Sequence, residues 1–206
     1  MTALLETIGR AAEAVRAGAD ELNRLDGQAG DGDLGVTMAK AATVLEGLIP
    51  DLEGKPAVEV LRTCGAALAK QVPSTSGTLV ATAFLRAARA AGEEGEDADL
   101  LARALRAAQV GIQDRGKAEP GSKTMLDALA PAVAAAETAA AGGESVAGTL
   151  RAAADAAEQG AQATKGMQAR HGRAGWLAER SAGHEDGGAR LVAIVLEAAA
   201  RSTAEA

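Results

Sequence analysis

Apolar residues recur in this chain at the three- and four-residue spacing that places them on one face of a helix. Segments with this spacing cover residues 2–18, 34–47, 56–71, 76–91, 97–115, 122–138, 144–165 and 187–202. Proline or glycine separates many of them: Pro50 and Pro56 bracket one predicted turn, and Gly142 and Gly143 close another helix. Connections this short favour antiparallel neighbours. The pattern therefore predicts an all-α bundle of about eight antiparallel helices.

Two stretches differ from this amphipathic pattern. Residues 191–196 are apolar on every side, so we expect their helix to be the central or most buried element of the bundle. Residues 165–188 form the one long stretch without a convincing helical period. Because long irregular segments in compact domains are often functional, this stretch is a candidate part of a site.

The composition agrees with helices in one domain. The 206 residues are 48% hydrophobic, which is enough for a core, and they include one Phe, one Trp and no Tyr. Alanine and leucine dominate, and both favour helices over sheets. Since no linker, repeat or low-complexity tract forces a boundary, residues 1–206 are predicted to form a single domain.

Charge and cysteine content exclude several classes of protein. The formal charge of −7 disfavours a nucleic-acid or anionic-membrane surface. The longest strongly apolar run is far shorter than the ~20 residues that a membrane span requires. Cys64 is the one cysteine, so no disulfide framework is expected, and its alanine-rich surroundings indicate a small buried side chain. We therefore expect a cytoplasmic protein without a membrane span.

A glycine-rich turn, DGQAGDGD, carries three aspartates: Asp26, Asp31 and Asp33. A fold that gathers them needs a cation, because each pair repels by roughly 4 kcal/mol at an effective dielectric near 20. Calcium is disfavoured, since the calcium-loop pattern counted from Asp31 requires other residues at Gly35 and Ala42. Magnesium, with a phosphate at the start of the following helix, fits better. The alternative is a solvated acidic turn in which Asp33 caps that helix.

Two further polar turns also precede predicted helices. The STSG sequence at residues 74–77 suits either a phosphate or an ordinary helix cap. Residues 116–124, GKAEPGSKT, resemble a phosphate loop, but Ser122 separates the second glycine from the lysine and no strand precedes it. It is therefore not a Walker motif, although such a turn can still hold an anion, and Met125 could contact an adenine.

The irregular stretch concentrates basic residues in an acidic chain. These residues are Arg170, His171, Arg173, Arg180 and His184. Its arginines could receive the negative charge of a nucleotide. The histidines lie thirteen residues apart without a Ser or Cys nucleophile pattern, so we interpret them as surface or supporting groups, and Trp176 as a packing residue.

Taken in order, these segments resemble the nucleotide-binding L subunit of dihydroxyacetone kinase. The resemblance runs from about Leu22 to Leu196 and rests on LDGQAGDGDLGVTM, STSG, DRGKAEPGSKTMLDALAP and MQARHGRAGWLAERSAGHEDGGA. It implies a barrel of eight antiparallel helices that holds ADP or ATP at one end through two magnesium ions. Leu34, Thr37 and Ser122 depart from the most familiar bacterial pattern, which leaves the phosphate contacts and the acceptor sugar open.

The resemblance also implies roles for individual residues. The metal ligands, and with them the catalytic centre, would be Asp26, Asp31 and Asp33. The nucleotide contacts would be Leu34, Gly35, Val36, Thr37, Thr75, Ser76, Gly116, Met125, Arg173, Asp186, Gly187 and Gly188.

The implied function is transfer of a phosphoryl group to dihydroxyacetone held by a separate K subunit. Either free ATP is the donor, or a resident ADP is recharged by a phosphohistidine protein of the sugar phosphotransferase system; both use the same aspartates. Three alternatives stay open: a kinase subunit for a related small ketose or aldose, a nucleotide-loaded regulatory binding module, and a helical bundle whose acidic turn merely binds divalent ions.

Overall fold

The computed structural model describes residues 3–28, 30–91, 97–171 and 181–204. Its helices are α1 (Ala3–Ala17), α2 (Ala19–Asp26), α3 (Leu34–Leu52), α4 (Ala57–Gln71), α5 (Thr75–Ala91), α6 (Ala98–Gly116), α7 (Leu126–Ala141), α8 (Val146–Ala163), the short 3₁₀ helix η1 (Thr164–Gly166) and α11 (Gly187–Ala204). The predicted helical segments agree with these bounds to within a few residues. The prediction of an all-α fold is confirmed.

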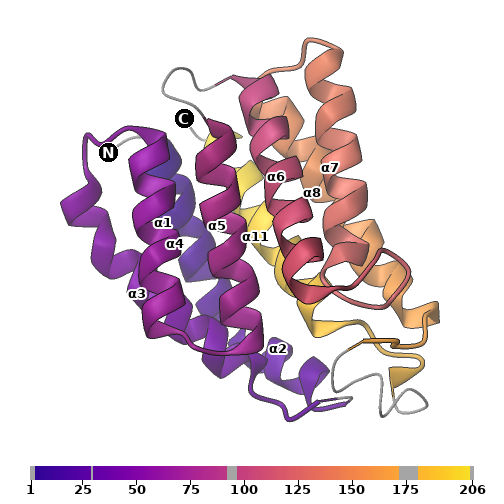
Figure 1. The fold of residues 1–206 in the computed structure, drawn as a ribbon. Helices are drawn as coiled ribbons and strands as arrows, with labels where there is room; N and C mark the ends of the chain where they lie inside the picture. Colours follow the sequence, from indigo (N-terminus) through magenta and orange to yellow (C-terminus); the bar gives the residue numbers. More distant parts are fainter. Residues whose placement is uncertain (1–2, 29, 92–96, 172–180, 205–206) are drawn as a thin grey trace.

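Eight of the helices close into a ring. Helix α1 packs against α3, the contacts continue in chain order from α3 to α8, and α11 packs against both α8 and α1. Neighbouring helices run in opposite directions, as Figure 1 shows. Helices α3, α5, α7 and α11 therefore begin at the same end of the barrel, where α2 also lies (Figure 1). We call this the site end, and the opposite end the far end.

Small residues let the helices of the ring approach closely. Ala132 and Ala136 of α7 and Ala153 and Ala157 of α8 have no exposed surface. A Cβ on Gly160 of α8 would collide with the backbone of α7. The alanine-rich composition thus supplies both helix propensity and the close packing of the barrel wall.

Three details of the predicted helices were wrong. Helix α2 was missed, because Gly18 breaks the pattern and the eight residues that follow are mostly polar. Helix α3 continues through Pro50 to Leu52, so Pro50 lies in the last turn of a helix and not in a loop. Helix α11 is one member of the ring and not its centre, although the other half of that prediction holds, since it has more buried residues than any other described helix.

The expectation of a buried cysteine is confirmed. Cys64 in α4 is 1% exposed, and burial raises the pKa of its thiol to about 11. Among the helices that the structure describes, none combines the length and the apolar character needed to cross a bilayer.

Candidate functional site

The turn between α2 and α3 brings the three predicted aspartates together. One carboxylate oxygen each from Asp26, Asp31 and Asp33 lies within 4.8 Å of the other two. Asp26 is half-buried, whereas Asp31 and Asp33 are exposed. Three carboxylates at this separation repel one another, and oxygen ligands of this kind are those that magnesium prefers. The residues present therefore fit a divalent metal.

Backbone hydrogen bonds hold this turn in shape. Asp26 Oδ2 accepts from the N–H groups of Gly32 at 2.9 Å and Asp33 at 3.0 Å, and Gly32 adopts a φ of 78°. Asp33 occupies the N-cap position of α3, but its side chain makes no capping hydrogen bond. The alternative in which Asp33 serves mainly to cap α3 is therefore not supported, and its carboxylate remains beside the other two.

The start of α3 is fixed against α2 by a glycine. A Cβ on Gly35 would collide with the carbonyl oxygen of Ala19, so only glycine allows the two helices to lie this close. Asn23 Oδ1 accepts from the N–H of Val36 at 3.1 Å, and the N–H of Thr37 donates to the Asp33 carbonyl. The amides of Val36 and Thr37 are therefore already bonded within the protein, while the Val36 side chain is 65% exposed.

The start of α11 meets the aspartate turn directly. A Cβ built on Gly187 would lie 2.9 Å from Leu34 Cδ2 and 3.5 Å from the backbone nitrogen of Asp26. A Cβ on the next residue, Gly188, would lie 3.3 Å from Met125 Cβ. The two glycines thus join the aspartate turn, the first turn of α11 and the loop before α7 at one place.

Asp186, which is half-buried, caps α11. Its Oδ1 accepts from the N–H of Ala189 at 2.8 Å, and its own N–H donates to Thr164 Oγ1 at 2.9 Å. Burial raises the pKa of Asp186 to about 7; the bond from Ala189 and the charge of Lys123 oppose this rise, and Asp127 adds to it. This carboxylate is therefore held in the fold and is close to neutral over part of the physiological range.

The loop before α7 is closed by its own aspartate. The Asp127 carboxylate accepts from the N–H groups of Gly121 and Thr124. Met125 is buried and belongs to an apolar cluster that includes Leu79 of α5. Gly116, the last residue of α6, also lies against Leu79, since a Cβ on it would be 3.4 Å from Leu79 Cδ2. Gly116 therefore lies against a residue that packs on the apolar cluster to which Met125 belongs.

The STSG turn begins α5 at the same end. Ser74 Oγ accepts from the N–H of Gly77 at 2.9 Å, so Ser74 is the residue that caps the helix. Thr75 is exposed and Ser76 is half-buried. The cap alternative is thus confirmed for Ser74, and it leaves the hydroxyls of Thr75 and Ser76 in the first turn of α5.

Two basic residues were missed by the sequence reasoning. Lys123 is 4% exposed, and its Nζ donates to three main-chain carbonyls, so it is a buried internal lysine and not a phosphate-loop lysine.

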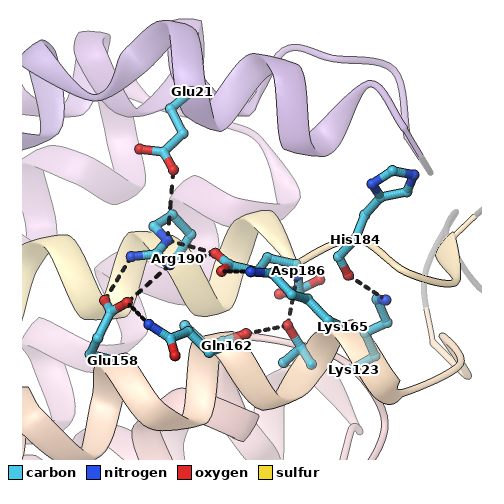
Figure 2. Close-up of polar contacts among 11 residues, drawn as sticks. Glu21, Lys123, Glu158, Gln162, Lys165, His184, Asp186 and Arg190 are labelled. Atoms are coloured by element: carbon cyan, nitrogen blue, oxygen red, sulfur yellow. Dashed lines mark hydrogen bonds and ion pairs between the residues drawn. The ribbon is translucent and has the colours of Figure 1, made fainter.

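The second of these residues, Arg190 of α11, donates to Glu185 at 2.5 and 2.8 Å and to Glu158 at 2.7 Å (Figure 2). Burial opposes the ionised form of Glu185, but hydrogen bonds from Arg190 and Lys165 outweigh it and lower its pKa.

The remaining predicted residues all come from the irregular stretch before α11. Arg173 and Trp176 lie outside the described residues. His171 and His184 are exposed, in agreement with their interpretation as surface groups. A sequence signal for Arg190 did exist, since it is the only charged residue between Gly187 and Leu196.

The fold and the site define a class: a closed antiparallel barrel of helices with a carboxylate cluster and several helix starts at one end. Residues 28–201 match the model of the DAK2 domain, and the chain therefore belongs to the DAK2 domain family.

Relatives align over most of the chain. It is 34% identical over 205 residues to the ADP-binding subunit of the PEP-dependent dihydroxyacetone kinase of Escherichia coli, covering 99% of this chain and 98% of that subunit. It is 36% identical over 177 residues to the ADP-binding subunit of PEP-dependent dihydroxyacetone kinase 1 of Listeria innocua, covering 86% and 84%. It is also 37% identical over 186 residues to the D-erythrulose kinase of Mycolicibacterium smegmatis, covering 89% of this chain but 32% of that enzyme.

The solved structures agree with this placement. The dihydroxyacetone kinase of C. freundii superposes with a TM-score of 0.78 at 27% identity, over 98% of this chain and 35% of that one. The same enzyme has been solved in complex with AMP-PNP and Mg²⁺, and that structure also gives a TM-score of 0.78, at 26% identity, over 98% and 34%.

Proposed function

We propose that this chain is the nucleotide-binding subunit of a dihydroxyacetone kinase. In this role it binds ADP or ATP with two magnesium ions and transfers a phosphoryl group to dihydroxyacetone held by a separate K subunit. The observation that carries the proposal is the cluster of Asp26, Asp31 and Asp33 within 4.8 Å, beside the start of α11. Full-length similarity to an ADP-binding subunit supports the same function.

Asp26, Asp31 and Asp33 would hold the metal. Magnesium supplies charge neutralisation and alignment for phosphoryl transfer when it is bound. The backbone bonds to Asp26 preorganise the turn, so the carboxylates need little rearrangement on binding. No protein nucleophile is required, because positioning and electrostatics carry most of the catalysis of such transfers.

The helix starts at the site end would receive the nucleotide. Helices α3, α5, α7 and α11 all direct their positive N-terminal ends there, which favours an anionic ligand. We assign the contacts to residues from those starts and from the irregular stretch. They are Leu34, Gly35, Val36, Thr37, Thr75, Ser76, Gly116, Met125, Arg173, Asp186, Gly187 and Gly188. Because the amides of Val36 and Thr37 are bonded internally, these two residues would contribute side chains.

The donor in this proposal is a resident ADP that a phosphohistidine protein recharges. Its support is that the Escherichia coli and Listeria innocua relatives are PEP-dependent and ADP-binding. A cytoplasmic location, expected from the lone cysteine, belongs to the same proposal. The match to a D-erythrulose kinase favours one alternative acceptor, a four-carbon ketose.

Native mass spectrometry of the freshly purified protein tests the nucleotide and the metal count together. Retained ADP with two magnesium ions is the expected result. A protein that gains nucleotide mass only after ATP and magnesium are added would indicate an exchanging ATP kinase. No binding in either condition would contradict the proposed function.

An aspartate substitution tests the catalytic assignment. We expect Asp31→Asn to lower phosphoryl transfer by at least about a hundredfold when a K subunit and a donor are supplied, since a lost metal ligand removes several kcal/mol of charge stabilisation. Asp51→Asn, at an exposed position near the far end of α3, is the control and should retain full activity. Equal activity in the two variants would contradict the assignment. Partner binding without turnover in the wild-type protein would favour the regulatory module.

A further inference from the structure

Lys123 is a buried cation surrounded by carbonyl groups. It lies in the loop between α6 and α7, with a φ of 60° that side chains rarely adopt. Its Nζ lies 3.2 Å from the carbonyl oxygen of Met167, 2.5 Å from that of Ser181 and 2.8 Å from that of His184. Figure 2 shows the contact with His184. Three acceptors match the three N–H donors of an ammonium group.

The three carbonyls come from two separate stretches of chain. Met167 follows η1, whereas Ser181 and His184 precede α11. Carbonyl dipoles that point at one place repel one another, and a central cation reverses that repulsion. Lys123 therefore ties two chain segments to the loop that begins α7.

Neighbouring bonds confirm that these segments form one layer over the loop. The N–H of Arg170 donates to the Ser122 carbonyl at 3.1 Å, and the N–H of Ala169 donates to Ser181 Oγ at 3.2 Å. The N–H of Gly183 donates to the Lys165 carbonyl at 3.1 Å. These neutral hydrogen bonds hold the two segments to each other and to the loop. Lys123 adds a charged side chain to the same contacts.

The fastened layer leads directly into the start of α11. Glu185 follows His184 and pairs with both Lys165 and Arg190. Asp186 then caps α11, and Gly187 lies against Leu34 and Asp26. This short connection runs from the carbonyls that Lys123 binds to the start of α11 beside the aspartate turn.

We propose that Lys123 is a positioning residue for the nucleotide: it holds the 184–188 turn against the loop that carries Met125. The inference rests on the proposed function, because the turn and Met125 are assigned there as nucleotide contacts. Lys123 itself touches no nucleotide, since its three donors are engaged within the protein. Its removal should lower nucleotide affinity beyond what the loss of stability alone explains.

The test compares ADP binding by calorimetry in the wild-type protein and three variants, each first freed of bound nucleotide, in magnesium and below the melting transition. Lys123→Met has similar length but cannot donate, and we expect it to weaken ADP binding at least about tenfold. Lys123→Arg retains charge and donors and should recover most of that loss. Leu150→Ala removes a buried side chain one turn from the far end of α8, so it should lower the melting temperature and leave ADP affinity unchanged.

The outcomes distinguish failure of the proposed function from failure of the positioning role of Lys123. Wild-type protein that does not bind ADP would overturn the proposed function. Wild-type binding with unchanged affinity in Lys123→Met, or equal weakening in Leu150→Ala, would overturn only the positioning role. If Lys123→Met does not fold, Lys123→Gln replaces it with the same expectation. Failure of both to fold would show that Lys123 supports the whole fold, which also overturns the proposal.

Discussion

Turn glycines occur at both ends of the barrel, but the two ends differ in the close contacts that other glycines and the capping aspartates make. At the far end, Gly54 and Gly143 adopt φ values of 76° and 81° in open space, where glycine serves the turn conformation alone. At the site end, a Cβ on Gly35 or Gly77 would collide with a carbonyl oxygen of the preceding segment, that of Ala19 or Val72. These two glycines permit close approach of backbone to backbone.

The capping aspartates differ in the same way. Asp97 caps α6 at the far end from an exposed position, with its Oδ1 2.6 Å from the N–H of Leu100. Asp186 caps α11 at the site end from a half-buried position. The cap of α6 is thus an ordinary exposed helix cap, whereas the cap of α11 keeps a carboxylate in a partly buried position at a cost in stability. Such a cost is typical of a binding site.

The largest effect should come from Asp186 and its pH dependence. Because the pKa of this carboxyl is raised from 3.8 to about 7 in the folded state, the folded protein binds the proton more tightly than the unfolded chain. The free energy of unfolding should therefore fall as pH rises from about 4 to about 7, by about 1.4 kcal/mol per unit from this group. Asp186→Asn should remove this decline in urea unfolding without metal or nucleotide.

Asp97→Asn is the matched control for that measurement. It alters the exposed cap of α6 and leaves Asp186 in place, so the wild-type pH dependence should persist. A curve for Asp186→Asn that runs parallel to the wild-type curve between pH 4 and pH 7 would show that burial at the site end does not hold the proton.

A second comparison uses two glycines of the same helix. Gly35→Ala places a methyl group against the Ala19 carbonyl oxygen and should destabilise the protein by about 3 kcal/mol, because α2 and α3 must separate. Gly47→Ala, further along α3, meets nothing within 4 Å and should stabilise it by roughly 0.5–1 kcal/mol through helix propensity. Thermal and denaturant unfolding measure both. Equal effects would show that α2 and α3 are not in close contact.

The smallest effects should come from two buried threonines of opposite hydrogen-bonding state. Thr164 Oγ1, at the site end, donates to the Ala161 carbonyl and accepts from the N–H of Asp186, so Thr164→Val should cost about 2 kcal/mol. Thr149 Oγ1, towards the far end, is buried without a hydrogen-bond partner. Thr149→Val should therefore be neutral or stabilise by about 1 kcal/mol. Chemical denaturation that gives both variants the same sign would contradict this difference.

The sequence was sufficient for most of the fold because alanine-rich helices leave a strong period. It missed α2, whose eight residues include Asp20, Glu21, Asn23 and Arg24 and carry little apolar pattern. The aspartate turn was predictable because carboxylates of that density imply a cation. The close approach of Gly187 to Asp26 was not, since it depends on how the ring closes.

The role of Lys123 could not be predicted from residue types. Its acceptors are carbonyls 44, 58 and 61 positions later in the chain, and every residue has a carbonyl, so no pattern marks them. Its place in a sequence that resembles a phosphate loop points instead to an anion. Only the burial of the Lys123 side chain and its tertiary contacts show that it binds carbonyls and not an anion.

The most direct test of the central claim is a crystal structure with ADP and Mn²⁺ in place of magnesium, with the metal located by its anomalous signal. The account predicts manganese on Asp26, Asp31 and Asp33 and phosphates between the starts of α3 and α11. Manganese bound elsewhere, or a nucleotide away from the aspartate turn, would contradict it.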